Sequence, residues 1–164
     1  MEENYVEWLV KRKDPVYALP AKVLIVIVVV LSVFSALRTV LGVVFMTLAA
    51  IAAYFLFINL SIEYEYLFAE GGLRIDRIMG RARRKKAFDC EKADIQFIAP
   101  ADSYKLKDYE SAGIKVQDYS SGQKGAKVYA VIYQKGSEHM KVLIEPNEKM
   151  ISAMRRSFPS KMLV

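Results

Sequence analysis

Two adjacent apolar runs constrain this chain more than any other feature. The first, VLIVIVVVLSVFSAL, covers residues 23–37, and the second, VLGVVFMTLAAIAAYFLFINL, covers 40–60; neither contains a charged residue. A bilayer core needs roughly 20 apolar residues per helix, and the second run has that length by itself. The first reaches it by extending back to Tyr17, with the Lys22 ammonium snorkelling to the interface. The sequence therefore predicts a transmembrane helical hairpin over residues 17–60.

The alternatives to a hairpin fit less well. One helix over both runs would be roughly 60 Å long, about twice the hydrocarbon thickness. It would also place Arg38 near mid-bilayer, at a cost of about 3 kcal/mol, whereas a tight turn from Arg38 to Gly42 avoids both problems. A buried helix pair would show a polar face, and a cleaved signal peptide would show small residues at a cleavage site.

Basic residues flank the two runs unequally. Only Arg38 lies between the runs, while further basic residues follow from Arg74 onward. The positive-inside rule then places both termini in the cytoplasm and makes this a multi-pass protein of the inner cell membrane. Residues 1–16 are expected to form a cytoplasmic or interfacial segment, either lying along the headgroups or simply tethered. The basic residues that precede the runs are Lys11, Arg12, Lys13 and Lys22.

Small residues recur at i, i+4 spacing in both runs, a pattern that lets two helix backbones approach closely. We take them as candidates for transmembrane packing, although ordinary small-residue usage gives the same pattern. Neither run carries Asp, Glu, Lys or Arg in its middle, as a transporter or proton relay usually does, so the hairpin is expected to be an anchor. The packing candidates are Ser32, Ala36, Ala49 and Ala53.

The remainder of the chain is charged and β-rich. Residues 61–164 hold 19 of the 24 Lys and Arg and 14 of the 18 Asp and Glu. Residues 61–69 alternate, with Tyr64 and Tyr66 on one face and Glu63 and Glu65 on the other, which is typical of a half-buried strand. Glu-Gly-Gly at 70–72 then predicts a hairpin turn into a strand at 73–79. Further strands are expected at 87–90, 95–98, 114–116, 127–133 and 139–145.

A helix is expected to close the domain. Asn147 can cap it, residues 148–158 carry an apolar stripe through Met150 and Met154, and Pro159 ends it. The fold class is therefore an α+β membrane protein, with a bent antiparallel β-sheet or partial barrel and a C-terminal helix. Residues 61–164 are expected to fold as a separate cytoplasmic domain, with the strand order in 100–125 left open.

This pattern resembles bacterial pleckstrin-homology-like (PH-like) domains. The resemblance rests on EYEYLFAEGGLRIDRIMGRARRKKAFDCEKADI at 63–95, on the KVYAVIY and HMKVLIEP strands, and on the helix after Pro146. The whole chain, including YVEWLVKRKDPVYA and LIEPNEKM, also looks like a family of small two-span proteins of Gram-positive bacteria. The resemblance implies a PH-like domain on the cytoplasmic side of two spans, and it implies no known activity.

The densest charge cluster is the RARRKK run, which we expect in the turn between two early strands. Near a cytoplasmic leaflet, each basic residue gains about 1 kcal/mol from anionic lipid, so the run predicts contact with anionic lipid headgroups or with an acidic protein partner. The plainer alternative is a solvated run that only sets topology. Nucleic acid is not an expected partner, because no aromatic residues interleave with the charges. The candidate residues are Arg81, Arg83, Arg84, Lys85 and Lys86.

The chain offers little material for catalysis. Its single cysteine, Cys90, is expected to be a small core residue, and its single histidine, His139, is expected to face solvent. No nucleotide or metalloprotease motif appears, so we expect neither an enzyme nor a cofactor or metal. The predicted function is a membrane-anchored binding or scaffolding module. The alternative is a structural subunit that self-associates through its transmembrane helices without recognising headgroups.

Overall fold

The computed structural model describes residues 5–109 and 114–163, and these divide into two compact units. One unit holds two long helices, from Asp14 to Ile62, together with the short segment Met79–Arg83. The other holds the sheets and the last helix. It contains the N-terminal segment up to Lys13, which the sequence analysis had set apart from this domain.

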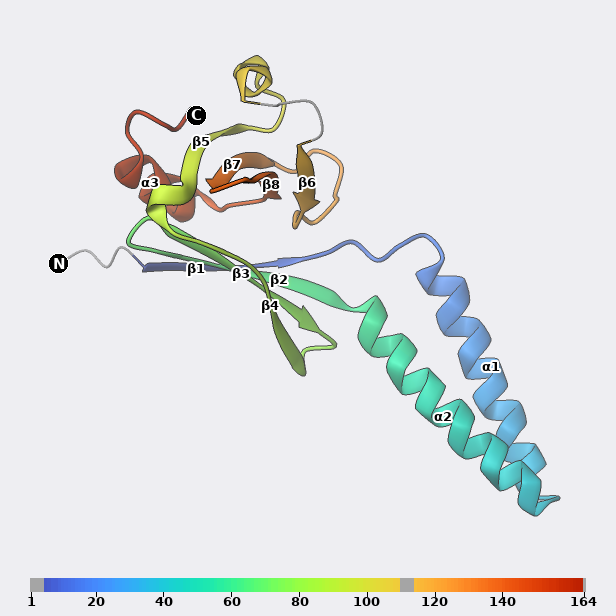
Figure 1. Ribbon diagram of the computed structural model, residues 1–164. Helices are drawn as coiled ribbons and strands as arrows, with labels where there is room; N and C mark the ends of the chain where they lie inside the picture. The colour runs from blue at the N-terminus through green and yellow to red at the C-terminus, as the bar shows by residue number, and fades with distance from the viewer. Residues whose placement is uncertain (1–4, 110–113, 164) are drawn as a thin grey trace. The chain divides into compact units, whose positions relative to one another are not determined.

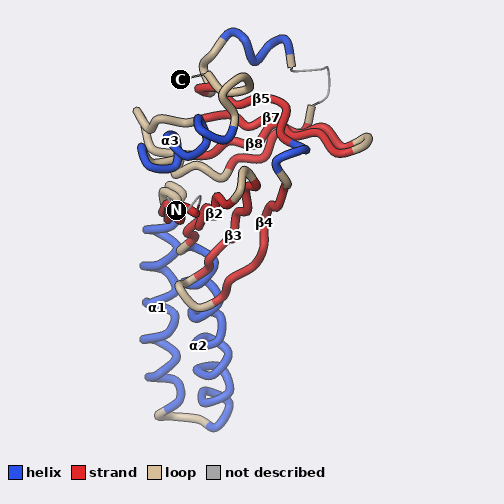
Figure 2. The backbone as a smooth tube through the Cα atoms, turned by 90° about the vertical axis from the view of Figure 1, so that its left-hand side faces the viewer, coloured by secondary structure: helices blue, strands red, loops and turns tan. Residues whose placement is uncertain are grey.

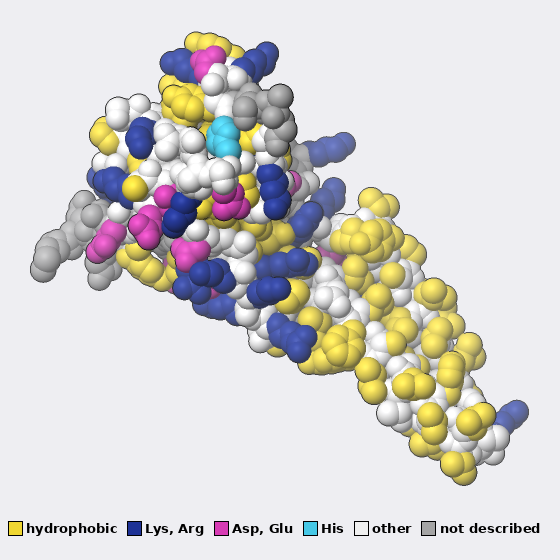
Figure 3. Space-filling model, in the orientation of Figure 1, with side chains coloured by type: hydrophobic (Ala, Val, Ile, Leu, Met, Phe, Trp, Pro, Cys, Tyr) yellow, Lys and Arg dark blue, Asp and Glu magenta, His cyan; other side chains and the backbone are white. Residues whose placement is uncertain are grey.

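The helical unit is the predicted hairpin. Helix α1 covers Ala18–Ala36 and helix α2 covers Val40–Leu60; they run side by side and are joined by a short turn (Figure 2). Both are long and apolar enough to cross a membrane, and exposed apolar side chains are frequent on the face of the hairpin that Figure 3 shows. Two spans of this kind fit a membrane protein, because these exposed faces would be unfavourable in water.

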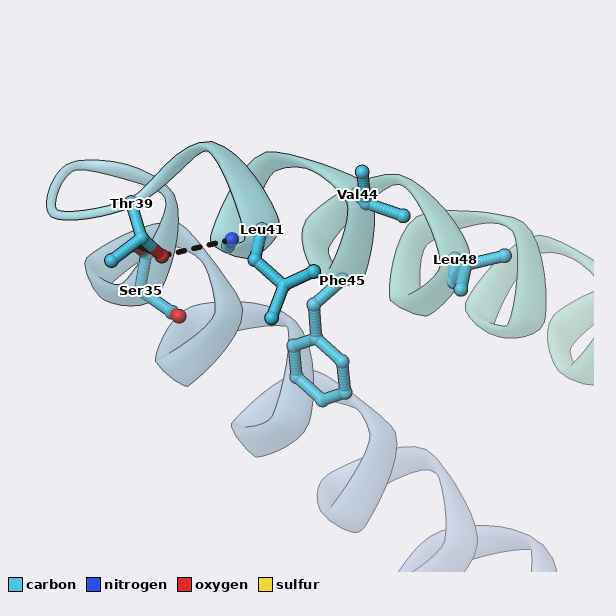
Figure 4. A pocket seen from close by; sticks show the side chains of 7 residues that line it. Ser35, Thr39, Leu41, Val44, Phe45 and Leu48 are labelled. Carbon is cyan, nitrogen blue, oxygen red and sulfur yellow. Dashed lines mark hydrogen bonds between the residues drawn. The ribbon is translucent and has the colours of Figure 1, made fainter.

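The turn between the helices is capped by Thr39. Its Oγ1 accepts a hydrogen bond of 3.0 Å from the Gly42 backbone nitrogen, which satisfies one of the free N–H groups at the start of α2 (Figure 4). Arg38 lies in this turn, as predicted, and therefore outside both helices.

The four packing candidates differ in how far they are buried. Of the four packing candidates, Ser32 and Ala49 are buried, while Ala36 and Ala53 are half-buried. The backbones of the two helices also approach closely at Gly42, which was expected only to end the turn. A Cβ at Gly42 would overlap the Ser35 carbonyl and lie 2.6 Å from the Ala36 backbone nitrogen. Only glycine fits there, because backbone atoms rather than flexible side chains limit the space.

The described residues of the sheet unit form two four-stranded sheets. The first has the order β1-β2-β3-β4 and the second β5-β7-β8-β6. Strand β6 pairs with β8 in parallel, so the second sheet is mixed rather than purely antiparallel. The first sheet consists of β1 (Tyr5–Lys11), β2 (Ile62–Ala69), β3 (Gly72–Met79) and β4 (Arg83–Cys90). The second consists of β5 (Ile95–Pro100), β6 (Lys115–Asp118), β7 (Tyr129–Lys135) and β8 (Glu138–Ile144).

Strand β1 corrects the prediction for residues 1–16. Residues 1–4 lie outside the described residues, but residues 5–11 do not lie apart from the domain. As β1 they pair antiparallel with β2 (Figure 1), with Tyr5 opposite Ala69 and Lys11 opposite Glu63. Trp8 also donates from Nε1 to the Glu145 carbonyl over 3.1 Å. The helical hairpin is therefore inserted in the chain between two neighbouring strands of one sheet.

Buried side chains from both sheets and from α3 (Glu148–Ser157) form the core. Asn147 caps α3 by accepting a 2.8 Å hydrogen bond from the Met150 backbone nitrogen, which confirms the predicted cap. Phe68 of β2 packs against Phe158, just after α3, with ring centroids 6.4 Å apart. The helix therefore covers apolar surface of the sheets. Short 3-10 helices, η1 (Lys92–Asp94) and η2 (Tyr104–Asp108), flank β5.

A buried tyrosine links the two sheets. The Tyr66 hydroxyl of β2 donates to the Tyr119 carbonyl over 2.6 Å and accepts from the Glu145 backbone nitrogen over 3.3 Å. Burial raises the pKa of Tyr66, so this hydroxyl stays protonated as a donor. The network satisfies polar backbone groups that the packing of the sheets would otherwise leave buried without partners.

Candidate functional site

The basic run begins in the tight turn between β3 and β4. The Ala82 backbone nitrogen donates to the Met79 carbonyl over 3.2 Å, and the two central residues, Gly80 and Arg81, both have φ of 57°. Positive φ at both central positions is typical of a type I′ hairpin turn. Glycine or asparagine usually occupies the second of them, so an arginine there is uncommon.

This turn is attached to the end of α2. The Gly80 backbone nitrogen donates to the Ser61 carbonyl over 2.8 Å. A Cβ at Gly80 would lie 2.8 Å from Ile58 Cγ1 and 3.1 Å from Ile58 Cα, so the glycine allows the turn to lie directly on the helix. The predicted turn therefore exists, and it is held at the C-terminal end of α2.

The remaining basic candidates lie in β4, which begins earlier than predicted. The sequence pattern predicted a strand only from Ala87, whereas β4 begins at Arg83. All five basic residues are exposed, and basic side chains gather on the visible face of the strands (Figure 3). Lysine and arginine are common on a strand such as β4 that ends a sheet, because their charges oppose pairing with another chain.

Ion pairs divide the basic run into two classes. Arg84 makes two contacts with Glu65, from Nη1 to Oε2 over 2.8 Å and from Nη2 to Oε1 over 2.9 Å. Lys86 Nζ lies 3.1 Å from Asp89 Oδ2. Among the described residues, neither Arg83 nor Lys85 has an ion pair. These two therefore have more charge available for an external anion than Arg84 and Lys86 have.

The partner of Arg84 is a buried carboxylate. Glu65 was expected on a solvent-facing side of β2, but its exposure is 3%, and Glu63 is buried as well. Burial raises the pKa of Glu65, a hydrogen bond with Glu7 raises it further, and the Arg84 charge opposes both effects. Arg84 is therefore already engaged in compensating a buried charge.

The other reactive candidates have structural positions. Cys90 is 5% exposed, and burial raises its pKa to about 12, so its thiol stays protonated and is a poor nucleophile. His139 is half-buried rather than fully exposed. In the described part of the chain, no group of three or more His, Cys, Asp or Glu side chains could hold a metal ion.

Comparison with known proteins agrees with this architecture. The model of the family described as "Bacterial PH-like domain (DUF6106)" matches residues 2–164. No curated protein and no solved structure matches the chain.

Proposed function

Because the chain belongs to the family of bacterial PH-like domains (DUF6106), we propose that it is a membrane-anchored binding module whose basic turn contacts anionic lipid headgroups. The helical hairpin is the anchor and the PH-like domain is the binding part. PH-like domains are generally non-catalytic, and this agrees with the buried, protonated Cys90. Arg83 and Lys85 are expected to contribute most to this contact and the paired Arg84 and Lys86 less, while Arg81 contributes through its position in the turn at the end of α2.

The attachment of the turn to α2 is the observation that carries this proposal. The Gly80–Ser61 hydrogen bond and the close packing on Ile58 keep Arg81 next to the last turn of a helix that spans the membrane. A helix of this length ends at the boundary between hydrocarbon and headgroups. The basic side chains of the β3–β4 turn then lie within reach of the anionic leaflet, where each gains about 1 kcal/mol.

The burial pattern of the hairpin favours this proposal over self-association through the spans. Ser32 and Ala49 are buried within the hairpin itself, and the backbone of α1 occupies the space next to Gly42. These small residues are thus used in packing α1 on α2, so they are not free for a second copy.

An acidic protein partner is the outcome expected if neutral and anionic bilayers give the same result in the experiment below.

The experiment compares matched double variants of the full chain in nanodiscs. In discs containing phosphatidylglycerol, backbone amides of 79–86 should exchange hydrogen more slowly than in phosphatidylcholine discs, and added salt should reverse this protection. Arg83→Ser/Lys85→Ser should remove about 2 kcal/mol of headgroup attraction and most of the lipid-dependent protection. Arg84→Ser/Lys86→Ser should remove less, because Glu65 and Asp89 already neutralise these charges.

Equal protection in neutral and anionic discs would overturn the lipid proposal. An equal effect of the two double variants would show that the intramolecular ion pairs do not determine which charges reach the lipid. Melting of each variant is the folding control, because Arg84→Ser leaves Glu65 buried without its main partner.

The proposal also requires both termini to lie on the cytoplasmic side. A reporter that is active only outside the cytoplasm should be silent when fused after Val164 and active when inserted beside Thr39. The physical reason is the excess of basic residues before α1 and after α2 over the single Arg38 in the turn. Activity of the fusion after Val164 would contradict the proposed orientation.

A further inference from the structure

A hollow of about 360 Å³ lies within the helical unit where the β3–β4 turn meets α2. Its walls differ in chemistry. The helix contributes the apolar and aromatic side chains of Tyr54, Phe57 and Ile58, together with Ser61, while the turn contributes Gly80 and Arg81. The hollow therefore combines a cation with an apolar wall, which suits an amphiphile with an anionic head.

We infer that this hollow binds one anionic phospholipid, with the phosphate at the Arg81 guanidinium and an acyl chain along Tyr54 and Phe57. The inference rests on the proposed function, which places the turn at the cytoplasmic leaflet. It goes further by assigning a single bound lipid to a defined place. A general attraction to the leaflet would need only the exposed charges of β4. A bound lipid needs both the cation and the aromatic wall.

The backbone around the hollow is held in place before any ligand binds. Gly80 is tied to the Ser61 carbonyl and packed on Ile58, and Arg81 follows in a left-handed conformation, φ 57°. A non-glycine residue in this conformation carries a conformational cost, so asparagine or glycine would suit the turn better. Arginine at this position therefore costs turn stability, and its guanidinium can bind a phosphate through two parallel hydrogen bonds.

Depth and charge together select a phospholipid as the occupant. Tyr54 is 62% exposed and Phe57 is 42% exposed, both within the last two turns of α2. Aromatic side chains at this level of a spanning helix contact lipid at the headgroup boundary. A soluble anion would gain nothing from the aromatic wall, and a neutral lipid would gain less from Arg81, whereas an anionic phospholipid uses both.

Native mass spectrometry of the full chain, loaded with phosphatidylglycerol in detergent, tests the inference. We expect one lipid retained per chain, and roughly tenfold weaker retention in Arg81→Asn, through loss of a charge-assisted contact. Asparagine adopts the left-handed conformation more readily than arginine, so the variant should melt at the same or a higher temperature. Arg38→Asn is the matched control: it removes the same charge at the other end of the hairpin and should retain the lipid.

A second variant tests the apolar wall without changing charge. Tyr54→Ala/Phe57→Ala should also weaken retention, and phosphatidylcholine should be retained less than phosphatidylglycerol by the unmodified protein. Retention that is unchanged in Arg81→Asn, or equal for the two lipids, would overturn the inference. If no lipid is retained while the nanodisc experiment still shows salt-sensitive protection, the bound-lipid site fails and the proposed function stands. If lipid retention behaves as expected but the salt-sensitive protection in nanodiscs is absent, the bound-lipid site stands and the general contact of the basic run with the leaflet fails.

Discussion

A protein in which residues 13–61 are replaced by Asn-Gly is expected to be soluble, monomeric and β-rich. Strands β1 and β2 pair antiparallel with Lys11 opposite Glu63, so the hairpin of α1 and α2 leaves and re-enters the domain at neighbouring positions. A two-residue Asn-Gly turn is the preferred connection for such a pair. Removing both helices also removes the large exposed apolar surface that requires a membrane.

The matched control is the fragment 62–164, which lacks β1 altogether. It loses the burial of Val10, worth about 1.5–3 kcal/mol, the Trp8–Glu145 hydrogen bond and every backbone bond from β1 to β2. The exposed edge of β2 is then a template for association with other chains. We expect this fragment to aggregate, while the Asn-Gly protein gives a single gel-filtration peak and a cooperative thermal transition.

Equal solubility and melting of the two proteins would show that β1 contributes nothing to the domain. The comparison also tests the sequence-based prediction that residues 61–164 are self-contained, which the pairing of β1 with β2 contradicts.

Gly42→Leu is expected to open the transmembrane hairpin. Even the first carbon of the new side chain would overlap the Ser35 carbonyl, and the contacting atoms are backbone, so the helices themselves must separate. Overpacking of a well-packed contact costs about 1–3 kcal/mol and sometimes more, and here no side-chain rotation can relieve it. Spin labels at the exposed positions Leu19 and Tyr54 should then show a longer and broader distance distribution in double electron–electron resonance.

Val44→Leu serves as the control for added volume in the same helix. Val44 is 54% exposed, so a larger side chain there extends toward lipid and should leave the distance distribution unchanged. If Gly42→Leu also leaves it unchanged, the close approach of α1 and α2 at this glycine is wrong.

Local patterns predicted a large part of the architecture correctly. The two charge-free runs became α1 and α2, the Glu-Gly-Gly signal became the β2–β3 turn, and Asn147 caps α3 as its position suggested. The PH-like resemblance is confirmed by the family match over residues 2–164. These features depend on neighbours within a few residues, so hydropathy, turn chemistry and capping are sufficient to predict them.

The misses share a different cause, which is pairing between distant parts of the chain. Residues 5–11 alternate only weakly, and their partner strand begins some fifty residues later, beyond the whole membrane hairpin. Glu65 looks solvent-facing by alternation, yet the Arg84 guanidinium contacts and neutralises it from another strand. Gly42 is a different case: its contact with Ser35 is close in sequence, but it forms only when α1 and α2 pack against each other after the turn.

The candidate site follows the same division. Composition and spacing were enough to single out the basic run and to predict a membrane nearby. The distinction between paired Arg84 and unpaired Arg83, and the hollow beside Arg81, depend on where Glu65, Ser61 and Ile58 lie in space. Charge density can be read along a chain because it depends only on neighbouring residues. Ion pairing and the shape of a surface hollow depend instead on contacts that form only when separate segments fold together.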